Sequence, residues 1–359
     1  MLKVYQKYLI KDYLSIFLKI SFIFVILGFV MGILEELNFF SGSNVKFYFP
    51  VFLVFLNIPS LIYEIFPFIF LLTSQFFFIN LLEKGELNTL KNKGLNSSSI
   101  LKILGVLSFI LGILIIIFFY NLSAELKFQY LDIKKNYTKD NKYLATITEN
   151  GLWIKDEKNG KINFINASKF SDDYLYNLDV IQLDKNFNFL FNIKSKKAYI
   201  KKFDWLLYDV KTIDSSNVSL EEKEIIFETN FNSNEINNLF SNLSSLTLWK
   251  LVDLKENYNS VNYSTTEIDY HLQKIISYPF FITIISVLTS ILMLNIKHQK
   301  PKIFLVVLGI LISVFIYYVN FFFGALGKNE KIPLYVSVWA PIIILIIVSS
   351  IGIVRINEK

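Results

Sequence analysis

Five long apolar runs that contain no charged residue constrain the fold of this chain most strongly. A helix needs about 20 apolar residues to cross the roughly 30 Å hydrocarbon core of a bilayer. The runs are Ile65–Leu82, Ile103–Tyr120, Ile275–Ile296, Ile303–Leu326 and Ile332–Val354. A sixth run, Ile20–Leu34, reaches a full span if the Lys19 side chain extends to the headgroups and the helix begins near Tyr13. The sequence therefore predicts an α-helical membrane protein with six transmembrane helices.

The composition supports this class and excludes several kinds of site. Of the 359 residues, 53% are hydrophobic and 18% are charged, whereas soluble domains carry roughly 25% charged residues. The chain has no Cys, which excludes disulfides, thiolate metal sites and a thiol nucleophile. Its two histidines, His271 and His298, argue against a histidine-built metal site. We therefore expect no catalytic residue, metal or nucleic acid partner, and we attribute the net charge of +6 to loop bias.

Lys and Arg residues in the short loops predict the orientation, because cytoplasmic loops carry an excess of them. With a cytoplasmic N-terminus, twelve fall inside and only Lys46, Lys328 and Lys331 fall outside. The inside set is Lys3, Lys7, Lys11, Lys84, Lys91, Lys93, Lys102, Lys297, Lys300, Lys302, Arg355 and Lys359. We predict that both termini are cytoplasmic, with three spans in 1–121 and three in 271–359, and that residues 122–270 lie outside.

Residues 122–270 differ in pattern from the rest of the chain. Apolar and polar residues alternate in short runs with turn residues about every 8–12 positions, which is typical of an antiparallel β-domain. The predicted strands include Tyr143–Thr148, Gly151–Ile154, Lys161–Ile165, Asp179–Leu183, Phe187–Ile193, Ala198–Phe203 and Glu224–Thr229. Helices are predicted near Ser233, over Leu246–Asn257 and from about Thr265 into the fourth span. The pattern fits both a solvated β-domain and one with an open apolar face for a lipid or partner.

The predicted cytoplasmic loop at about 83–94 has the pattern of a short amphipathic helix. Glu83, Leu87 and Leu90 share one helical face, Gly94 is placed to end the helix, and Ser97–Ser99 are placed to cap the third span. One interpretation is a helix that lies among the headgroups. The other is a coupling helix that inserts into a cytoplasmic motor. The chain has no G-x-x-x-x-G-K-[ST] loop of its own and so cannot bind ATP in that manner.

Acidic residues and prolines mark the predicted outer side. Glu35, Glu36 and Glu64 fall at that face, where we expect them to be solvated, although they would also suit a polar entrance. Pro59 and Pro67 interrupt the apolar stretch after Phe47. They favour a separate interfacial helix over 47–58, followed by a kinked span.

Four segments, in order, resemble the lipopolysaccharide export permease family LptF/LptG. They are the Leu82…Glu86-Leu87…Leu90…Gly94 run, Gly151-Leu152-Trp153-Ile154-Lys155-Asp156, Leu272-Gln273-Lys274…Pro279, and Gly324-Ala325-Leu326-Gly327…Ile332-Pro333…Trp339-Ala340-Pro341. The last segment favours the LptG type over LptF. The resemblance implies a 3+3 arrangement of spans in the bacterial inner membrane, with an inserted periplasmic antiparallel β-domain that is jellyroll-like.

The resemblance also implies partners and roles. The partners would be a second six-span permease of LptF type, a homodimeric cytoplasmic ATPase of LptB type, a periplasmic bridge protein of LptC or LptA type, and lipopolysaccharide. ATP and Mg²⁺ would bind to the ATPase, and this chain would hold no cofactor. Carried over by residue, the ATPase contacts would be Glu83, Glu86, Leu87 and Leu90. The lateral gate would be lined by Ile26, Phe29 and Val30 of span one and by Phe315, Tyr318 and Phe322 of span five.

The sequence thus predicts a transport subunit that extracts a large lipid from the outer leaflet of the inner membrane. Exposing acyl chains to water costs about 0.8 kcal/mol per CH₂, so the path must be shielded and powered. The family often has basic residues at the outer end of span one, where this chain has Glu35 and Glu36. Two alternatives are a membrane-bound enzyme that uses Glu35, Glu36 or Glu64 on a lipid at the outer face, and a non-transporting scaffold or sensor.

Overall fold

The computed structural model describes most of the chain and divides it into two compact units. The described residues are 3–41, 45–135, 137, 152–158, 160–171, 173–214, 218–233, 236, 242–260, 265–295 and 301–357. Met1–Lys127 and Thr266–Lys359 form a helical unit, and Phe128–Thr265 form a second unit. The predicted domain boundaries at 122 and 270 lie within a few residues of the divisions after Lys127 and Thr265. The predicted strand Tyr143–Thr148 and Lys297, Lys300 and Lys359 lie outside the described residues.

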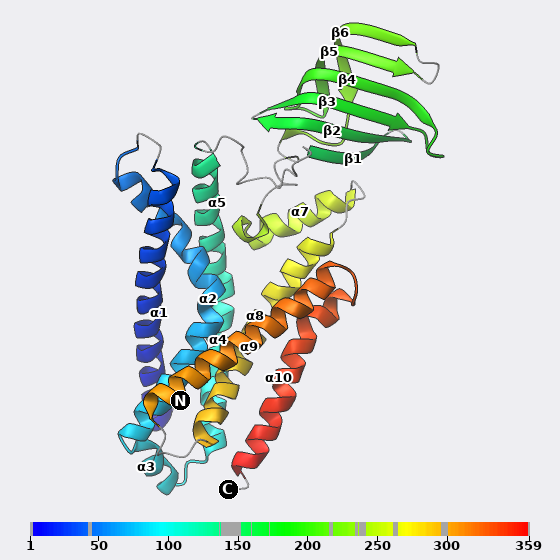
Figure 1. Ribbon diagram of the computed structural model, residues 1–359. Helices are drawn as coiled ribbons and strands as arrows, with labels where there is room; N and C mark the ends of the chain where they lie inside the picture. Colours follow the sequence, from blue (N-terminus) through cyan, green and yellow to red (C-terminus); the bar gives the residue numbers. More distant parts are fainter. Residues whose placement is uncertain are drawn as a thin grey trace. The chain divides into compact units, whose positions relative to one another are not determined.

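Six helices in the described residues are long and apolar enough to cross a membrane, as the sequence predicts. The helical elements are α1 (Val4–Phe39), α2 (Tyr48–Glu83), α3 (Glu86–Asn92), α4 (Ser97–Leu114), α5 (Asn121–Lys135), α8 (Thr266–Asn295), α9 (Lys302–Lys328) and α10 (Leu334–Asn357). A π-helical segment, Ile115–Tyr120, joins α4 to α5 and makes them one continuous span. The short helix α3 lies at the same end of the bundle as both termini (Figure 1).

The ends of several helices differ from the sequence prediction. The prediction of a separate helix over 47–58 is wrong, because α2 runs unbroken through Pro59 and Pro67. Helix α1 begins at Val4, well before Tyr13. The predicted 83–94 helix is shorter, since Glu83 ends α2 and Gly85 adopts a left-handed φ of 66° before α3 starts. Asn96 holds the cap position of α4, and Ser97 is already helical.

Close helix contacts hold the helical unit together. Helix α1 packs mainly on α2, α4 packs on α8, and α9 packs mainly on α10. Small residues permit the α4–α8 approach, because a Cβ at Gly112 would lie 2.9 Å from the Cα of Pro279. Two buried apolar clusters fill the interior, one around Phe66, Phe70 and Ile282 and one around Leu9, Phe77 and Leu87.

The second unit contains one antiparallel sheet in which each described strand pairs with the next. The strands are β1 (Leu152–Lys158), β2 (Lys161–Ser171), β3 (Tyr174–Leu183), β4 (Phe189–Tyr199), β5 (Asp204–Asp214) and β6 (Ser219–Glu228), in the order β1-β2-β3-β4-β5-β6. Cross-strand partners Ile154, Ile165, Val180 and Ile193 share the face that holds the core. Phe231 and Ile236 cover that face, and the Trp205 indole donates to the Phe231 carbonyl.

Two details of this unit correct the predicted elements. Residues 201–203 are a bend between β4 and β5 and not part of a strand, and β5 itself was not predicted. Asp209 in β5 has a φ of 50°, which shifts the alternation between Leu207 and Val210. The predicted helix over 246–257 is α7, Leu248–Ser260. The predicted fold class, six membrane-capable helices with an inserted antiparallel sheet, is confirmed.

Candidate functional site

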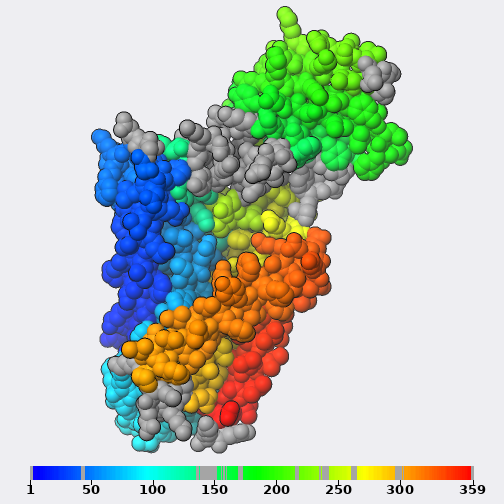
Figure 2. Space-filling model, viewed as in Figure 1, coloured from blue at the N-terminus to red at the C-terminus, as the bar shows by residue number. Residues whose placement is uncertain are grey.

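The apolar outer faces of α1 and α9 are the first candidate surface. On α1, Ile26 and Val30 are exposed in one stripe that also contains Leu18 and Phe22, each four residues apart. Figure 2 shows α1 and α9 on the same face of the helical unit. Such faces contact lipid or another membrane protein when the helices lie in a bilayer. Phe29 differs from its predicted neighbours, since it packs inward, with its ring centroid 5.2 Å from that of Phe55.

The predicted residues of span five all lie on the outer face of α9. Phe315, Tyr318 and Phe322 are 70%, 64% and 60% exposed. Within this chain, α9 is held to α2 by the Gln75 amide, which donates to the Leu305 carbonyl. The two predicted halves of the gate therefore lie on separate helices with different packing partners, and each presents an open apolar face.

The short helix α3 is the second candidate surface, and its residues divide into inward and outward sets. Leu87 is 2% exposed and Leu90 packs against the same cluster, so both face the bundle. Glu83 is exposed at the end of α2, and Glu86 accepts a hydrogen bond from the Tyr8 hydroxyl at 2.7 Å. The side chains that face outward are Asn88, Thr89, Lys91 and Asn92. With Leu87 buried, the outward surface of α3 is polar, and the four predicted ATPase contacts stay a prediction.

Left-handed glycines lie at both ends of α3, Gly85 before it and Gly94 after it. The predicted end at Gly94 is confirmed, because Gly94 has a φ of 84° and its N–H donates to the Lys91 carbonyl at 2.9 Å. The Leu95 N–H donates to the Leu90 carbonyl at 3.0 Å. These two bonds form a Schellman motif, which ends a helix at a left-handed residue.

A polar cluster links four helices inside the bundle and was not predicted from the sequence. The Tyr13 hydroxyl of α1 lies 3.1 Å from Ser74 Oγ of α2, 3.4 Å from Ser108 Oγ of α4 and 3.5 Å from Ser286 Oγ of α8. All four side chains are fully buried. Serine and tyrosine in apolar spans carry no periodic signal that pairs them, so only the packing of the helices brings this cluster together.

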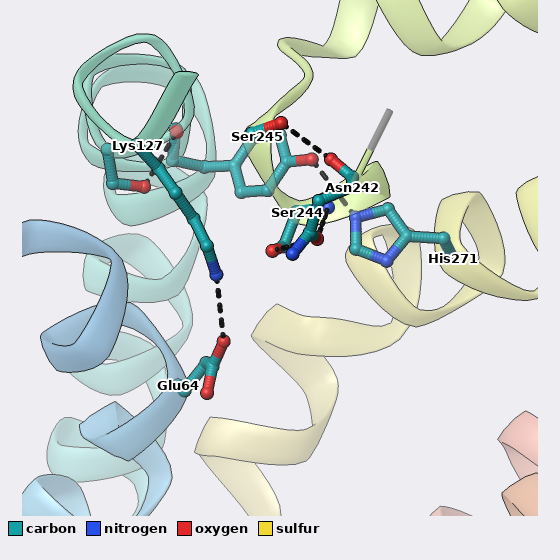
Figure 3. Close-up of polar contacts among 8 residues, drawn as sticks. Glu64, Lys127, Asn242, Ser244, Ser245 and His271 are labelled. Carbon is teal, nitrogen blue, oxygen red and sulfur yellow. Dashed lines mark hydrogen bonds and ion pairs between the residues drawn. The ribbon is translucent and has the colours of Figure 1, made fainter. Parts of the chain in front are cut away.

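A second unpredicted cluster lies where α2, α5 and α8 meet. The carboxylate of Glu64 lies 3.8 Å from Lys127 Nζ, and the two side chains point toward each other from α2 and α5 (Figure 3). The Tyr120 hydroxyl lies 3.1 Å from His271 Nε2. Tyr63 stacks on Tyr278, with ring centroids 4.9 Å apart.

The structure does not bring the three predicted outer acids together. Glu35 and Glu36 lie at the end of α1, whereas Glu64 lies about 24 Å along α2 from its start at Tyr48. Glu36 is 2% exposed, so its predicted solvation is wrong. The described residues contain no group of three His, Cys, Asp or Glu side chains that would hold a metal ion. Glu35, Glu36 and Glu64 therefore do not form one site in the described residues.

Comparison with known proteins assigns the chain to a family. The sequence-family model described as lipopolysaccharide export system permease LptF/LptG matches residues 7–355 of this chain. The matched range includes all six spans and the inserted sheet. A search of curated proteins returns no match. The match runs through α3, the outward faces of α1 and α9 and both polar clusters. The chain is thus a multi-pass membrane protein that belongs to the LptF/LptG family of lipopolysaccharide export permeases.

Proposed function

We propose that this chain is a permease subunit of an ABC-type lipopolysaccharide exporter in the bacterial inner membrane. It extracts the lipid from the outer leaflet and passes it to a periplasmic bridge protein, while a separate homodimeric ATPase supplies the energy. The family match over residues 7–355 carries this proposal. The open apolar stripes on α1 and α9 support it, because a lipid that enters sideways needs an apolar entrance.

A second six-span permease of LptF type completes the entrance in this proposal, with this chain as the LptG-type subunit. The α1 stripe of each permease then faces the α9 stripe of the other across the lipid. Helix packing supports this arrangement, since α1 and α9 each retain an exposed face after packing on their own neighbours. The positive-inside bias supports cytoplasmic termini and a periplasmic sheet.

The outward face of α3 contacts the ATPase in this proposal. Leu87 and Leu90 anchor α3 to the bundle, which leaves Asn88 and Lys91 free to meet a partner. Glu83 and Glu86 flank this face. A helix of seven residues has little stability of its own, so its anchoring residues prepare it for binding.

The test compares two variants of the tagged chain, one altered on α3 and one altered on α4. The double variant Asn88→Trp/Lys91→Glu changes only exposed positions of α3, and Lys102→Glu makes the same charge reversal at an exposed position of α4. We expect the double variant to lose co-purification with an ATPase in mild detergent and to stop lipid export from proteoliposomes. The Lys102→Glu control should retain both.

Normal ATPase capture and export by the double variant would exclude α3 as the coupling surface. Export by wild-type chain with no second permease present would exclude the paired arrangement. A chain that captures neither an ATPase nor a second permease would instead support the scaffold alternative.

A further inference from the structure

Tyr8 of α1 contacts Glu86 of α3, and the next residue of each helix belongs to one buried apolar cluster. The Tyr8 hydroxyl donates to the Glu86 carboxylate at 2.7 Å, and Leu9 and Leu87 are both buried in the same apolar cluster. Hydrogen bonds to a carboxylate are stronger than those between neutral groups. The first turns of α1 therefore contact α3 directly, although α1 and α3 are separated by the whole of α2 along the chain.

The polar contact adds something that the apolar contact cannot supply. Burial of Leu87 and Leu90 sets which face of α3 meets the bundle, but apolar contacts do not select one partner helix. Gly85 and Gly94 at the two ends of α3 have left-handed φ values and no atom within 4 Å of an added Cβ. An added side chain at either end would therefore meet open space. A hydrogen bond has a preferred direction, so the Tyr8–Glu86 bond joins α3 specifically to α1.

Helix α1 connects this contact to the predicted gate. It is one unbroken helix from Val4 to Phe39 with no internal Pro. Val30, on its exposed stripe, lies about 33 Å along the axis from Tyr8 at 1.5 Å per residue. A continuous helix moves largely as a rigid rod, so a displacement at Tyr8 reaches Ile26 and Val30.

We propose that Tyr8 is a positioning residue that ties α3 directly to the lipid-facing helix α1. When the ATPase displaces α3, α1 moves with it through the Tyr8–Glu86 bond, in addition to any movement passed through α2 and α4. This inference rests on the proposed coupling role of α3. It assigns to Tyr8 a part in converting ATP hydrolysis into movement of the gate.

The chain offers a matched control on the same helix. Tyr8→Phe removes only the hydroxyl and keeps an exposed ring, so the fold is retained. Tyr5→Phe makes the same change three residues earlier, where the ring packs against the same apolar cluster and the hydroxyl has no partner among the described residues. A Glu86→Leu variant removes the acceptor from the other side of the bond.

Spin-label distances in the complex with the ATPase test the connection. The natural sequence has no Cys, so labels attach only at introduced positions. One pair, Lys93→Cys with Met31→Cys, measures α3 against α1, and a second pair, Lys93→Cys with Val106→Cys, measures α3 against α4; these three positions are exposed. Distances are compared with and without a non-hydrolysable ATP analogue.

We expect the nucleotide to change the α3–α4 distance while the α3–α1 distance stays narrow in wild type and in Tyr5→Phe. In Tyr8→Phe the α3–α1 distribution should broaden, and lipid exported per ATP hydrolysed should fall about tenfold, the change expected for one hydrogen bond to a charged group. Tyr8→Phe should add no further loss in the Glu86→Leu background.

Two outcomes overturn the inference in distinguishable ways. If the nucleotide moves α3 but Tyr8→Phe behaves like Tyr5→Phe, the Tyr8 link is wrong and the proposed coupling by α3 stands. If no α3 distance responds to the nucleotide in the intact complex, the proposed coupling fails and the link fails with it.

Discussion

At the scale of single residues, the Tyr13 hydroxyl joins four helices of the bundle. It lies within hydrogen-bond distance of serines from three other helices, all fully buried. Ser286 also donates to the Ile282 carbonyl at 3.0 Å, so it keeps a partner without the tyrosine. Hydrogen bonds between membrane helices contribute about 0.6 kcal/mol on average and up to about 2 kcal/mol.

Tyr13→Phe should therefore lower stability modestly and without loss of packing, because only the shared hydroxyl is removed. We expect a decrease of about 1 kcal/mol, seen as a drop of roughly 2 °C in the unfolding midpoint of the chain in detergent. Tyr317→Phe, at a side chain that is 65% exposed on α9, is the control and should leave the midpoint unchanged. Equal midpoints for the two variants would show that the cluster contributes nothing.

At the scale of elements, the α4–α8 contact depends on a missing side chain. A Cβ on Gly112 would lie 2.9 Å from the Pro279 backbone, which cannot move aside as a flexible side chain would. Directly after this contact, the span changes to the π-helical segment Ile115–Tyr120. The Asn121 side chain donates to the Ile117 carbonyl at 2.9 Å, which gives that carbonyl a partner at the end of the segment.

Gly112→Ala and Gly28→Ala should have opposite effects on stability. The first forces α4 away from α8 and should cost about 1–3 kcal/mol, as other overpacked positions do. The second adds a Cβ with no atom within 4 Å, and should be neutral or slightly stabilising because Ala favours a helix more than Gly. Thermal unfolding of both variants in the same detergent provides the comparison, and a stable Gly112→Ala chain would contradict the packing described here.

The helices and the sheet show how much a sequence of this kind can predict. Charge-free apolar runs predicted all six spans, because length and hydropathy alone decide whether a helix can cross a bilayer. The unbroken course of α2 through Pro59 and Pro67 was not predictable, since neighbouring helices decide whether a proline ends a membrane helix. β5 was missed because Asp209, with its φ of 50°, interrupts the alternation on which strand prediction relies.

The candidate site was predictable in part. The position of α3 and its end at Gly94 followed from glycine and leucine spacing, but the direction of Leu87 did not, because an amphipathic pattern does not say which face meets the bundle. The same holds for Phe29, which packs against the core cluster while Ile26 and Val30 are exposed. Tyr8 was missed because its partner, Glu86, is distant in sequence and the bond depends on how α1 and α3 pack.

At the scale of the whole molecule, the surfaces of the two units suit different surroundings. The helical unit exposes long apolar side chains along α1, α9 and α10, whereas the strands of the second unit carry exposed charges such as Lys196 and Glu221. A bilayer suits the first surface and water suits the second. The proposed orientation places α3 and the sheet in opposite compartments.

Labelling of single cysteines tests this orientation. Lys196→Cys in β4 should react with a membrane-impermeant maleimide in spheroplasts, because its side chain is 79% exposed in the sheet. Lys93→Cys, at the end of α3, should react only after the membrane is permeabilised. The reverse pattern would place the sheet in the cytoplasm and exclude export across the outer leaflet.

The sequential order of β1 to β6 has a consequence for biogenesis. Each strand hydrogen-bonds to the strand that follows it in the chain, so the described sheet needs no contact from residues made much later. Short-range pairing lowers the entropic cost of loop closure and favours rapid formation. The sheet is therefore able to assemble during synthesis, after α1 to α5 have left the ribosome and before α8 to α10 are inserted.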